Sequence, residues 1–516
     1  MTANQDADRQ RLHELGYAQE LNRKMGWFSN FAISFSIISI LAGAITTFWL
    51  AMYAGGGPVV WLCWIIVGLF ATCVGASMAE ICSAYPTAGG LYYWSAKLAK
   101  KNGPVWSWFT GWFNLIGQIG VIASVDFALA NFVWLCMSFY IDDFRRTPLT
   151  IFVIYLVMLA LHGLLNTFGV KVIKLLGDIS VWWHVVGVAI IFASLFIWSS
   201  DSGQGASALT EFRNGTGWSF PGSGIYVFLI GLLLAQYTIT GFDASAHVSE
   251  ETVGAQTEAP KAIIRSIYVS AIAALIMNIA MFAVIPSGSY DDIAAQGILA
   301  GPAVFLTITS SAIGKFLVII STVGQFFCGM ASVTANSRMI YAFSRDKGLP
   351  GSDLWHRINP KTRTPTNSVW LGVGLSAIVG ALSLIQTKAD IPVAFFAMTG
   401  ICVVGLYISY IIPVYLRLKN PDFRPGPWNL GDRSKTIGWI SVAWVALVSI
   451  VFVCPFFVPW NKWETANLTG PVLLIAAVFV GGWWVLGAKK WFKGPQVQGT
   501  PEELEAIEHE LSQLGH

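Results

Sequence analysis

Charged residues are scarce in this chain. Only 11% of its 516 residues are Asp, Glu, Lys or Arg, whereas 55% are hydrophobic, and the mean hydropathy is +0.61. A surface so poor in charge would not keep a water-soluble protein dispersed, so we expect the lipid bilayer to be its solvent. The formal net charge of +3 is too small to indicate a nucleic-acid partner.

Motifs of metal, redox and nucleotide chemistry are missing as well. The seven cysteines are scattered through apolar stretches without a CxxC, which argues against a disulfide framework and against a zinc site. The seven histidines never pair at helical spacing, and neither HExxH nor a GxxxxGK[ST] loop occurs. We therefore expect no metal, no cofactor, no ATP hydrolysis and no enzymatic activity. The polar N-terminal residues lack the apolar core of a signal peptide, so the first hydrophobic stretch should be retained.

Long hydrophobic stretches, by contrast, are abundant. A membrane-spanning helix needs roughly 20 apolar residues, and about twelve such stretches follow one another along the chain. The predicted spans 1 to 12 are, in order, residues 28–53, 58–80, 105–137, 149–168, 175–199, 225–249, 265–286, 316–343, 367–386, 391–416, 437–458 and 470–488. These stretches predict an all-α integral membrane protein.

The positive charges orient the spans. With the N-terminus in the cytoplasm, about 24 of the 31 Lys and Arg residues fall in cytoplasmic segments, where membrane proteins carry their excess of positive charge. We therefore expect both chain ends in the cytoplasm, in a plasma membrane or in a bacterial inner membrane. In the tail, Thr500, Pro501 and Glu503 have the spacing of a capping box, which predicts a short amphipathic helix on a surface.

Two spans carry small or polar residues at corresponding places. Span 1 contains SIISILAGAITT, residues 36–47, and span 6 contains YTITGFDA, residues 237–244. Their separation of five spans is that of an inverted repeat, and paired interruptions of this kind point to a transporter's binding site. The predicted organisation is a cytoplasmic segment 1–27, a first repeat 28–199, a second repeat 225–416, two further spans within 437–488, and a cytoplasmic tail 489–516.

An interrupted helix frees backbone groups that must find partners at membrane depth. Freed N–H groups suit a carboxylate, and freed carbonyls suit a cation. Small residues in a membrane helix also permit close helix packing, which is the alternative explanation. Because the interruptions come as a pair, we predict that they form a site.

Ionisable side chains within the spans are the next candidates. A carboxylate in the hydrocarbon region costs roughly 2.5–3.5 kcal/mol, so Asp126 in span 3 and Asp243 in span 6 should face a cavity or a partner. Asp243 could bind an ammonium group or carry a driving proton; the alternative is a buried carboxyl that ties helices together. His184 in span 5 could carry a coupling proton, although a lone histidine among aromatic residues is also a common packing residue.

Other polar and aromatic residues surround the same region. Tyr237 and Phe242 flank the interruption of span 6 and could cover a substrate or stack on its ammonium group. In span 8, Ser332 and Thr334 could face span 1 and coordinate a cation. Ordinary hydrogen bonding between helices would explain these two hydroxyls as well.

Several motifs resemble those of a known family. They include SAYPTAGGLYYW (residues 83–94), TGFDASAHVSEET (240–252) and SRMIYAFSRDKGLP (337–350). From about residue 15 to residue 490, the chain resembles the amino acid–polyamine–organocation permeases, and within them the amino acid/choline branch that includes GABA and choline permeases. The resemblance implies two inverted five-helix repeats plus two C-terminal helices, working by alternating access.

The resemblance also implies roles for single residues. The small residues Ala42–Ala44 would present N–H groups to a substrate carboxylate, Thr238–Gly241 would form the broken part of span 6, and Tyr237 would act as an aromatic gate. His184 is similar in placement to a basic residue of span 5 that replaces a sodium ion in proton-coupled members, but it is not the lysine often found there, so the coupling ion stays open.

These observations predict a secondary active transporter that imports a small amino compound, an amino acid such as GABA, by proton-coupled symport. The alternatives are a permease for choline, another organic cation or a polyamine, and a sodium-coupled or exchange mechanism. The expected partners are the amino substrate, the coupling proton or sodium ion, and the lipid bilayer. The predicted substrate-binding residues are Ala42, Gly43, Ala44, Asp126, Tyr237, Thr238, Thr240, Gly241, Phe242 and Asp243, and the predicted coupling residues are His184, Asp243, Ser332 and Thr334.

Overall fold

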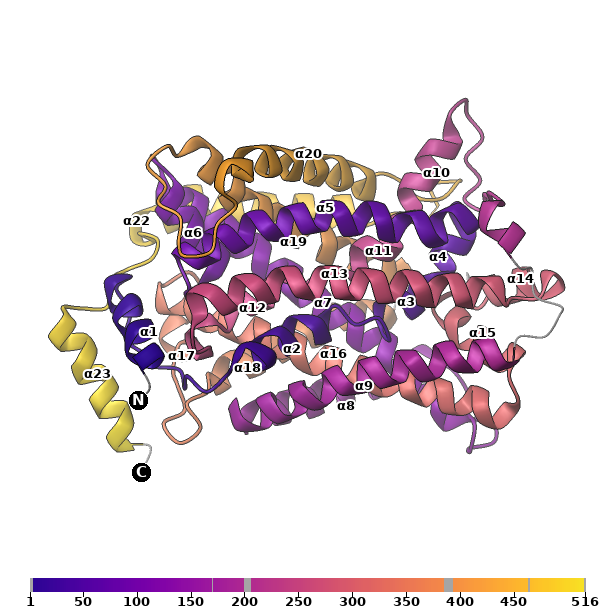
Figure 1. Cartoon of the computed structure of the whole chain (residues 1–516), viewed down its shortest axis with the longest axis horizontal. Helices are drawn as coiled ribbons and strands as arrows, with labels where there is room; N and C mark the ends of the chain where they lie inside the picture. The colour runs from indigo at the N-terminus through magenta and orange to yellow at the C-terminus, as the bar shows by residue number, and fades with distance from the viewer. Residues whose placement is uncertain (1–2, 169, 199–205, 385–392, 463–464, 515–516) are drawn as a thin grey trace.

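Long parallel and antiparallel helices build the protein. The computed structural model describes residues 3–168, 170–198, 206–384, 393–462 and 465–514. Among these residues, ten helices are long and apolar enough to cross a membrane, and they run along the long axis of the molecule (Figure 1). They are α5 (Gly57–Ala84), α7 (Gly103–Ser138), α8 (Pro148–Thr167), α9 (Val170–Trp198), α13 (Ala255–Ala283), α16 (Ser311–Arg345), α18 (Thr366–Gly380), α19 (Val393–Lys419), α20 (Ser434–Val453) and α21 (Thr469–Trp483). Short helical turns continue α18 to Leu384 and α21 to Trp491, which gives both the length of a crossing.

Two further crossings are assembled from short helices. Span 1 comprises α2 (Trp27–Ile37), α3 (Gly43–Thr46) and α4 (Phe48–Tyr53), and span 6 comprises α10 (Ser223–Gly231), α11 (Leu233–Thr238) and α12 (Ala244–His247). With the ten long helices, these two match the predicted spans, and the all-α prediction is confirmed. The predicted ends of spans 5, 9 and 10 at residues 199, 385–386 and 391–392 lie outside the described residues.

Local sequence explains where several spans begin. Helices α5, α7 and α8 each have a proline in their first turn, where a missing N–H group costs no hydrogen bond. Before α5, Gly56 has φ +63°, a left-handed conformation that suits glycine, and it lets the chain reverse sharply between spans 1 and 2. Before α8, the Thr147 hydroxyl accepts the N–H of Thr150 at 3.1 Å and caps the helix.

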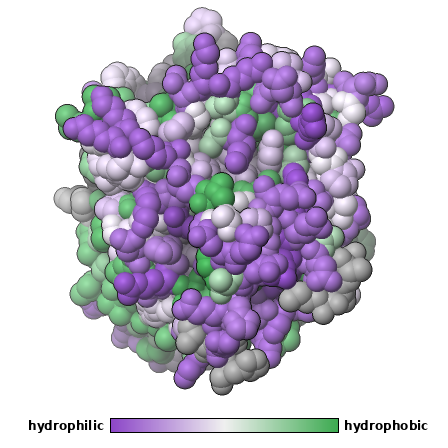
Figure 2. All heavy atoms as spheres, turned by 90° about the vertical axis from the view of Figure 1, so that its left-hand side faces the viewer, coloured by the Kyte–Doolittle hydropathy of each residue, from purple (hydrophilic) through white to green (hydrophobic). Residues whose placement is uncertain are grey.

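Short helices that the spans did not predict cover the two ends of the bundle. At the end that carries both chain termini, called here the terminal end, lie α1 (Ala3–Glu14), α6 (Gly90–Leu98), α17 (Ser352–Trp355) and α23 (Pro501–Leu514) (Figure 1). At the opposite end lie α14 (Tyr290–Ala294) and α15 (Ala300–Ile308). Figure 2 looks onto the terminal end, whose surface is mostly hydrophilic. The flanks are apolar: Phe196 on α9 is 78% exposed.

Corresponding spans of the two predicted repeats lie next to each other. Helix α5 packs along α13, and α7 packs along α16, as expected if spans 2 and 7, and spans 3 and 8, are related. Helix α2 packs against α12 and α13, and α19 packs against α7. The broken spans therefore lie inside the bundle, where other helices surround them. The repeat boundaries 28–199 and 225–416 remain a prediction.

The tail helix α23 rests on the N-terminal segment. Its capping box forms, with the Thr500 N–H donating to Glu503 at 2.7 Å and the Glu503 N–H donating back at 3.4 Å. Glu508 then accepts hydrogen bonds from Arg9 Nε at 2.5 Å, from His13 Nε2 at 2.7 Å and from the Gln19 N–H at 2.6 Å. One carboxylate thus fastens α23 to α1 and to the segment that leads into span 1.

Candidate functional site

The break in span 1 separates α2 from α3. Between Ile37 and Gly43 the backbone leaves helical geometry, and the N–H groups of Ile40 and Leu41 have no hydrogen-bond partner among the described residues. Two helices donate to the carbonyl oxygens. From α16, Ser321 Oγ donates to Leu41 O at 2.6 Å and Cys328 Sγ donates to Ile37 O at 3.2 Å, and from α13, Ser270 Oγ donates to Ile38 O at 3.4 Å. Helices α16 and α13 thus bind the carbonyl groups of this break, whereas the N–H groups of Ile40 and Leu41 stay free among the described residues.

The break in span 6 separates α11 from α12. Gly241 lies at its centre with φ +103°, and a Cβ atom there would come within 2.3 Å of Ile37 Cγ2. Only glycine tolerates both the conformation and the contact. The N–H groups of Gly241, Phe242 and Asp243 find no partner in the described part of the chain. The prediction that spans 1 and 6 are both interrupted is confirmed.

The two broken spans contact each other over several turns. A Cβ atom on Gly43 would meet Thr238 Oγ1 at 2.7 Å and Thr238 Cα at 2.9 Å. Ser34 Oγ donates to Phe242 O at 3.0 Å, and Asn30 Nδ2 donates to Ser245 O at 3.0 Å. The free N–H groups of both breaks therefore belong to one buried region at the centre of the bundle.

Asp243 is the hub of a buried polar network beside the span 6 break. It is 1% exposed, and Tyr410 OH donates to its Oδ1 at 2.6 Å. Its Oδ2 lies 3.2 Å from Asn114 Nδ2, 3.3 Å from Gln118 Nε2 and 3.3 Å from His247 Nε2. Four groups from α7, α12 and α19 thus surround one carboxylate, so three spans meet at this side chain.

Sequence reasoning found Asp243 but missed its partners. Asn114 and Gln118 in GWFNLIGQ are four residues apart, which places both amides on one face of a helix. This spacing could have indicated that both amides face the same partner. Tyr410 gave no signal, because aromatic residues make up 14% of this chain and its partner lies in a distant span.

Several buried polar atoms near this hub are unsatisfied or only weakly bonded. Gln118 Oε1 has no hydrogen-bond partner among the described residues, and the Gln236 amide and the Tyr407 hydroxyl interact only weakly, with each other and, for Tyr407, with Thr240. Buried polar groups are paired in the great majority of cases. Gln236 is on α11, immediately before the span 6 break, and the Tyr407 ring lies 6.1 Å from that of Phe242. Polar groups with spare capacity therefore border the break, as a site for a polar solute requires.

His184 reaches the other break. Its Nδ1 donates to Ser180 O at 2.8 Å, which leaves Nε2 to accept the Ser39 hydroxyl at 2.6 Å in the neutral ring. The same Ser39 oxygen accepts the Ala42 N–H at 3.0 Å. His184 is fully buried, and no carboxylate pairs with it among the described residues. A proton on Nε2 would redirect the Ser39 hydroxyl and so act directly on span 1.

The other predicted site residues divide into two groups. Those near the breaks include Tyr237, whose hydroxyl donates to Ser124 Oγ at 2.9 Å, and Thr238 and Thr240, whose hydroxyls donate to carbonyls of their own span. Ala42, Gly43, Ala44 and Phe242 are buried there too.

Three predicted residues have hydrogen-bond or ion-pair partners outside spans 1 and 6. Thr334 donates to Asn166 of α8 at 2.7 Å, Ser332 donates to a carbonyl of α16, and Asp126 pairs with His162 of α8. The hydroxyl and thiol that do meet span 1 from α16 are those of Ser321 and Cys328.

Ion pairs close the bundle on its terminal side. Glu251 pairs with Arg338 at 2.7 Å and Glu250 with Arg345 at 3.1 Å, which connects the end of span 6 to α16. Just beyond, Asp346 accepts the hydroxyl of Tyr17 at 2.9 Å. Burial, reinforced by the charge of Asp346, raises the pKa of Tyr17 well above its usual value, so this hydroxyl stays protonated and keeps donating.

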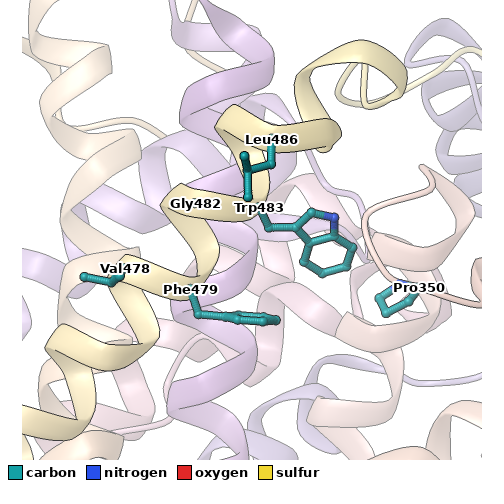
Figure 3. Close-up of a pocket in the computed structure, with 6 residues that line it drawn as sticks. All are labelled: Pro350, Val478, Phe479, Gly482, Trp483 and Leu486. Atoms are coloured by element: carbon teal, nitrogen blue, oxygen red, sulfur yellow. The ribbon is translucent and has the colours of Figure 1, made fainter.

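A hollow on the outer flank has a different chemistry. Pro350 and five residues around α21 line it, with Trp483 pointing across toward Pro350 (Figure 3). The lining residues are Pro350, Val478, Phe479, Gly482, Trp483 and Leu486. None of them is ionisable, and Leu486 is 82% exposed. An apolar hollow on this flank suits hydrocarbon rather than an amino compound.

The fold and the two facing breaks define a multi-pass membrane transporter. Residues 25–484 match the model of a protein family described as amino acid permease. The chain belongs to this amino acid permease family.

Individual relatives cover nearly the whole chain. The amino-acid permease BAT1 of Arabidopsis thaliana is 40% identical over 510 residues, which are 95% of this chain and 96% of that protein. The amino-acid permease BAT1 homolog of Oryza sativa subsp. japonica is 38% identical over 506 residues, which cover 95% and 96%. A putative polyamine transporter of Candida albicans is 28% identical over 522 residues, which cover 97% and 91%.

Proposed function

We propose that this protein is a secondary active transporter that imports a small amino acid, with GABA as the lead candidate, by proton symport and alternating access. The observation that carries the proposal is the pair of facing breaks, with five free N–H groups at Ile40, Leu41 and residues 241–243. Oriented N–H groups at helix ends bind carboxylates. The names of the amino-acid permease relatives agree with a substrate that carries one.

The substrate's amine finds its counterpart on the other side of the break. Asp243 supplies negative charge, and Gln118 Oε1 supplies a spare acceptor. Because Asp243 already has four donors, a direct bond to an ammonium group displaces one of the three donors to Oδ2, which lie at 3.2–3.3 Å, rather than Tyr410 at 2.6 Å. The Asp243 carboxylate therefore exchanges one of these donors for the substrate on binding. Ala42–Ala44, Tyr237 and residues 238–242 complete the proposed site.

Proton coupling is proposed through His184 and Asp243. His184 is hydrogen-bonded to Ser39 in the span 1 break, and Asp243 lies at the span 6 break. A sodium mechanism draws on Ser332 and Thr334 as oxygen ligands. The hydroxyl of Thr334 faces Asn166 on α8, which weighs against a cation held between α16 and span 1. Both chain ends are proposed to lie in the cytoplasm of a cell with this protein in its plasma membrane, or inner membrane in a bacterium.

One screen tests the proposed function. Purified protein in proteoliposomes is offered labelled GABA, other amino acids, choline and polyamines under an imposed proton or sodium gradient. We expect amino acids to accumulate with an inward proton gradient and not with a sodium gradient alone. A polyamine is the second candidate, favoured by the Candida albicans relative; accumulation of polyamines or choline without amino acids would reject the carboxylate site. An absence of uptake for every compound would reject transport itself.

A further inference from the structure

A second buried acid–histidine pair lies outside the proposed substrate site. Asp126 of α7 and His162 of α8 are both fully buried. His162 Nδ1 lies 3.1 Å from one oxygen of the carboxylate and 3.2 Å from the other. Among the described residues Asp126 has no other ion-pair partner, and His162 Nε2 has no hydrogen-bond partner. The pair is therefore isolated from other charge.

The surroundings of the pair are apolar or weakly acidic. The Phe326 ring lies 4.6 Å from the His162 ring, and the titratable side chains near Asp126 include Tyr155 of α8, Tyr237 of α11 and Cys328 of α16. None of these neighbours is a cation. No lysine or arginine of the described residues pairs with Asp126, so His162 alone can balance its charge.

We propose that Asp126 and His162 together form the site that binds and releases the coupling proton. The inference rests on the proposed function, because it assigns a role within proton symport. When His162 carries the coupling proton in addition to the one proton of a neutral imidazole ring, the pair is neutral overall. When that proton has left, the carboxylate and the neutral ring together carry one negative charge in a dry interior. A buried charge of that kind is costly unless water or an opposite charge approaches. Release of the proton therefore requires a conformation that lets water in.

Contacts on α16, which packs against the pair, and on α7 lead to both breaks. On α16, Gly329 packs so closely that a Cβ atom would come within 2.3 Å of Asp126 Oδ1 and 2.4 Å of His162 Cε1. The preceding residue, Cys328, donates to Ile37 O, where span 1 stops being helical. On α7, Ser124 accepts the hydroxyl of Tyr237, immediately before the span 6 break. A change in charge at the pair thus acts on elements that hold both broken spans.

His184 differs from this pair in one respect. Its partners are a hydroxyl and a carbonyl, so a proton on His184 brings an uncompensated positive charge into the bundle. The Asp126–His162 pair compensates its own charge. We therefore assign storage of the coupling proton to the Asp126–His162 pair, and the part of His184 is its hydrogen bond to Ser39 at the span 1 break.

The test compares uphill transport with exchange in proteoliposomes. For one proton per substrate, a gradient of one pH unit supports about tenfold accumulation by the wild type. Asp126→Asn keeps an oxygen that accepts from His162 but cannot carry the proton. We expect this variant to accumulate substrate about onefold while its exchange rate stays within about threefold of the wild type. His162→Gln should behave in the same way.

A matched control removes another buried carboxylate. Glu80 of α5 is 2% exposed and pairs with Arg417 at 2.9 Å, away from the Asp126–His162 pair. Glu80→Gln should lower stability without changing the ratio of accumulation to exchange. Accumulation by Asp126→Asn that equals the wild type, or an equal loss of exchange and accumulation in folded protein, would overturn the assignment.

A direct measurement covers the case in which both variants fail to fold. Substrate-dependent acidification inside wild-type proteoliposomes, followed with a pH-sensitive dye, should show about one proton for each substrate, in accordance with the tenfold gradient above. Substrate uptake without proton movement would overturn the inference and leave the transport function intact. Absence of any uptake would reject the proposed function instead, so the two failures are distinguishable.

Discussion

Replacement of Gly241 by alanine is the sharpest perturbation of the proposed substrate site. The residue has φ +103°, a region that costs a residue with a side chain about 1–3 kcal/mol. The added Cβ atom would also lie 2.3 Å from Ile37 Cγ2, and overpacking of this kind costs a further ~1–3 kcal/mol. The combined penalty of about 2–6 kcal/mol is relieved only by moving the Gly241 backbone or the end of α2.

Either movement displaces the free N–H groups that are proposed to bind the substrate carboxylate. A loss of about 1.4 kcal/mol in binding raises the dissociation constant tenfold, so we expect KM for uptake to rise at least tenfold. The apparent Tm should fall as well. Uptake kinetics in proteoliposomes and thermal unfolding in detergent measure the two effects on the same preparation.

Gly374→Ala is the matched control, because Gly374 is an exposed glycine of α18 with no atom near its added Cβ and no positive φ. Alanine favours a helix over glycine by about 1 kcal/mol, so this variant should be as stable as the wild type or slightly more so. If Gly241→Ala retained both the KM and the Tm of this control, the break would not depend on glycine and the argument would be refuted.

Three further substitutions test other contacts. Asp243→Asn places an NH₂ group among four donors. Hydrogen bonds to a charged group contribute roughly 1.5–3 kcal/mol, so KM should rise at least tenfold. Unchanged kinetics between pH 5 and 8 would remove Asp243 from the proposed site. His184→Ala should reduce proton-driven accumulation more than exchange, whereas equal loss of both would remove His184 from coupling. Burial tends to raise the pKa of Glu508, but the Gln19 N–H, His13 and Arg9 outweigh it and lower that pKa below its usual 4.5. Docking of α23 should therefore persist above pH 4.5 and be lost as the pH falls through the lowered pKa. Glu508→Gln should remove about 1.5 kcal/mol of docking free energy and speed proteolysis of the tail about tenfold at neutral pH. Equal cleavage rates for the variant and the wild type would contradict this.

Most of the fold could be predicted from the sequence, because insertion of a helix into a membrane depends on local hydrophobicity. Each predicted span is a run of apolar residues, and each run became a helix or a composite crossing. The breaks were visible for the same reason, since residues 36–47 and 237–244 combine small and polar residues inside otherwise apolar stretches. The short helices α6, α14 and α15 were not foreseen, because they are held by contacts with the ends of the bundle rather than by a long apolar run.

The partners of the site residues could not be derived from local patterns. Asp243 meets Asn114 and Tyr410, which are 129 and 167 residues away along the chain. Thr334 was expected to face span 1 and lies against α8 instead. Helix α16 is largely buried and apolar on several faces, so no amphipathic stripe in the sequence fixes its rotation.

The seam between spans 1 and 6 also restricts how the protein can move. Asn30 and Ser34 are hydrogen-bonded to the far side of the span 6 break, and Thr238 occupies the only space that a side chain on Gly43 would need. Sliding one span along the other would break these hydrogen bonds, at a cost of about 0.5–1.5 kcal/mol each. It would also force the closely packed backbones at Gly43 and Thr238 to overlap. We therefore expect spans 1 and 6 to move together as one rigid unit, against α7, α16 and α19, during the proposed alternating-access cycle.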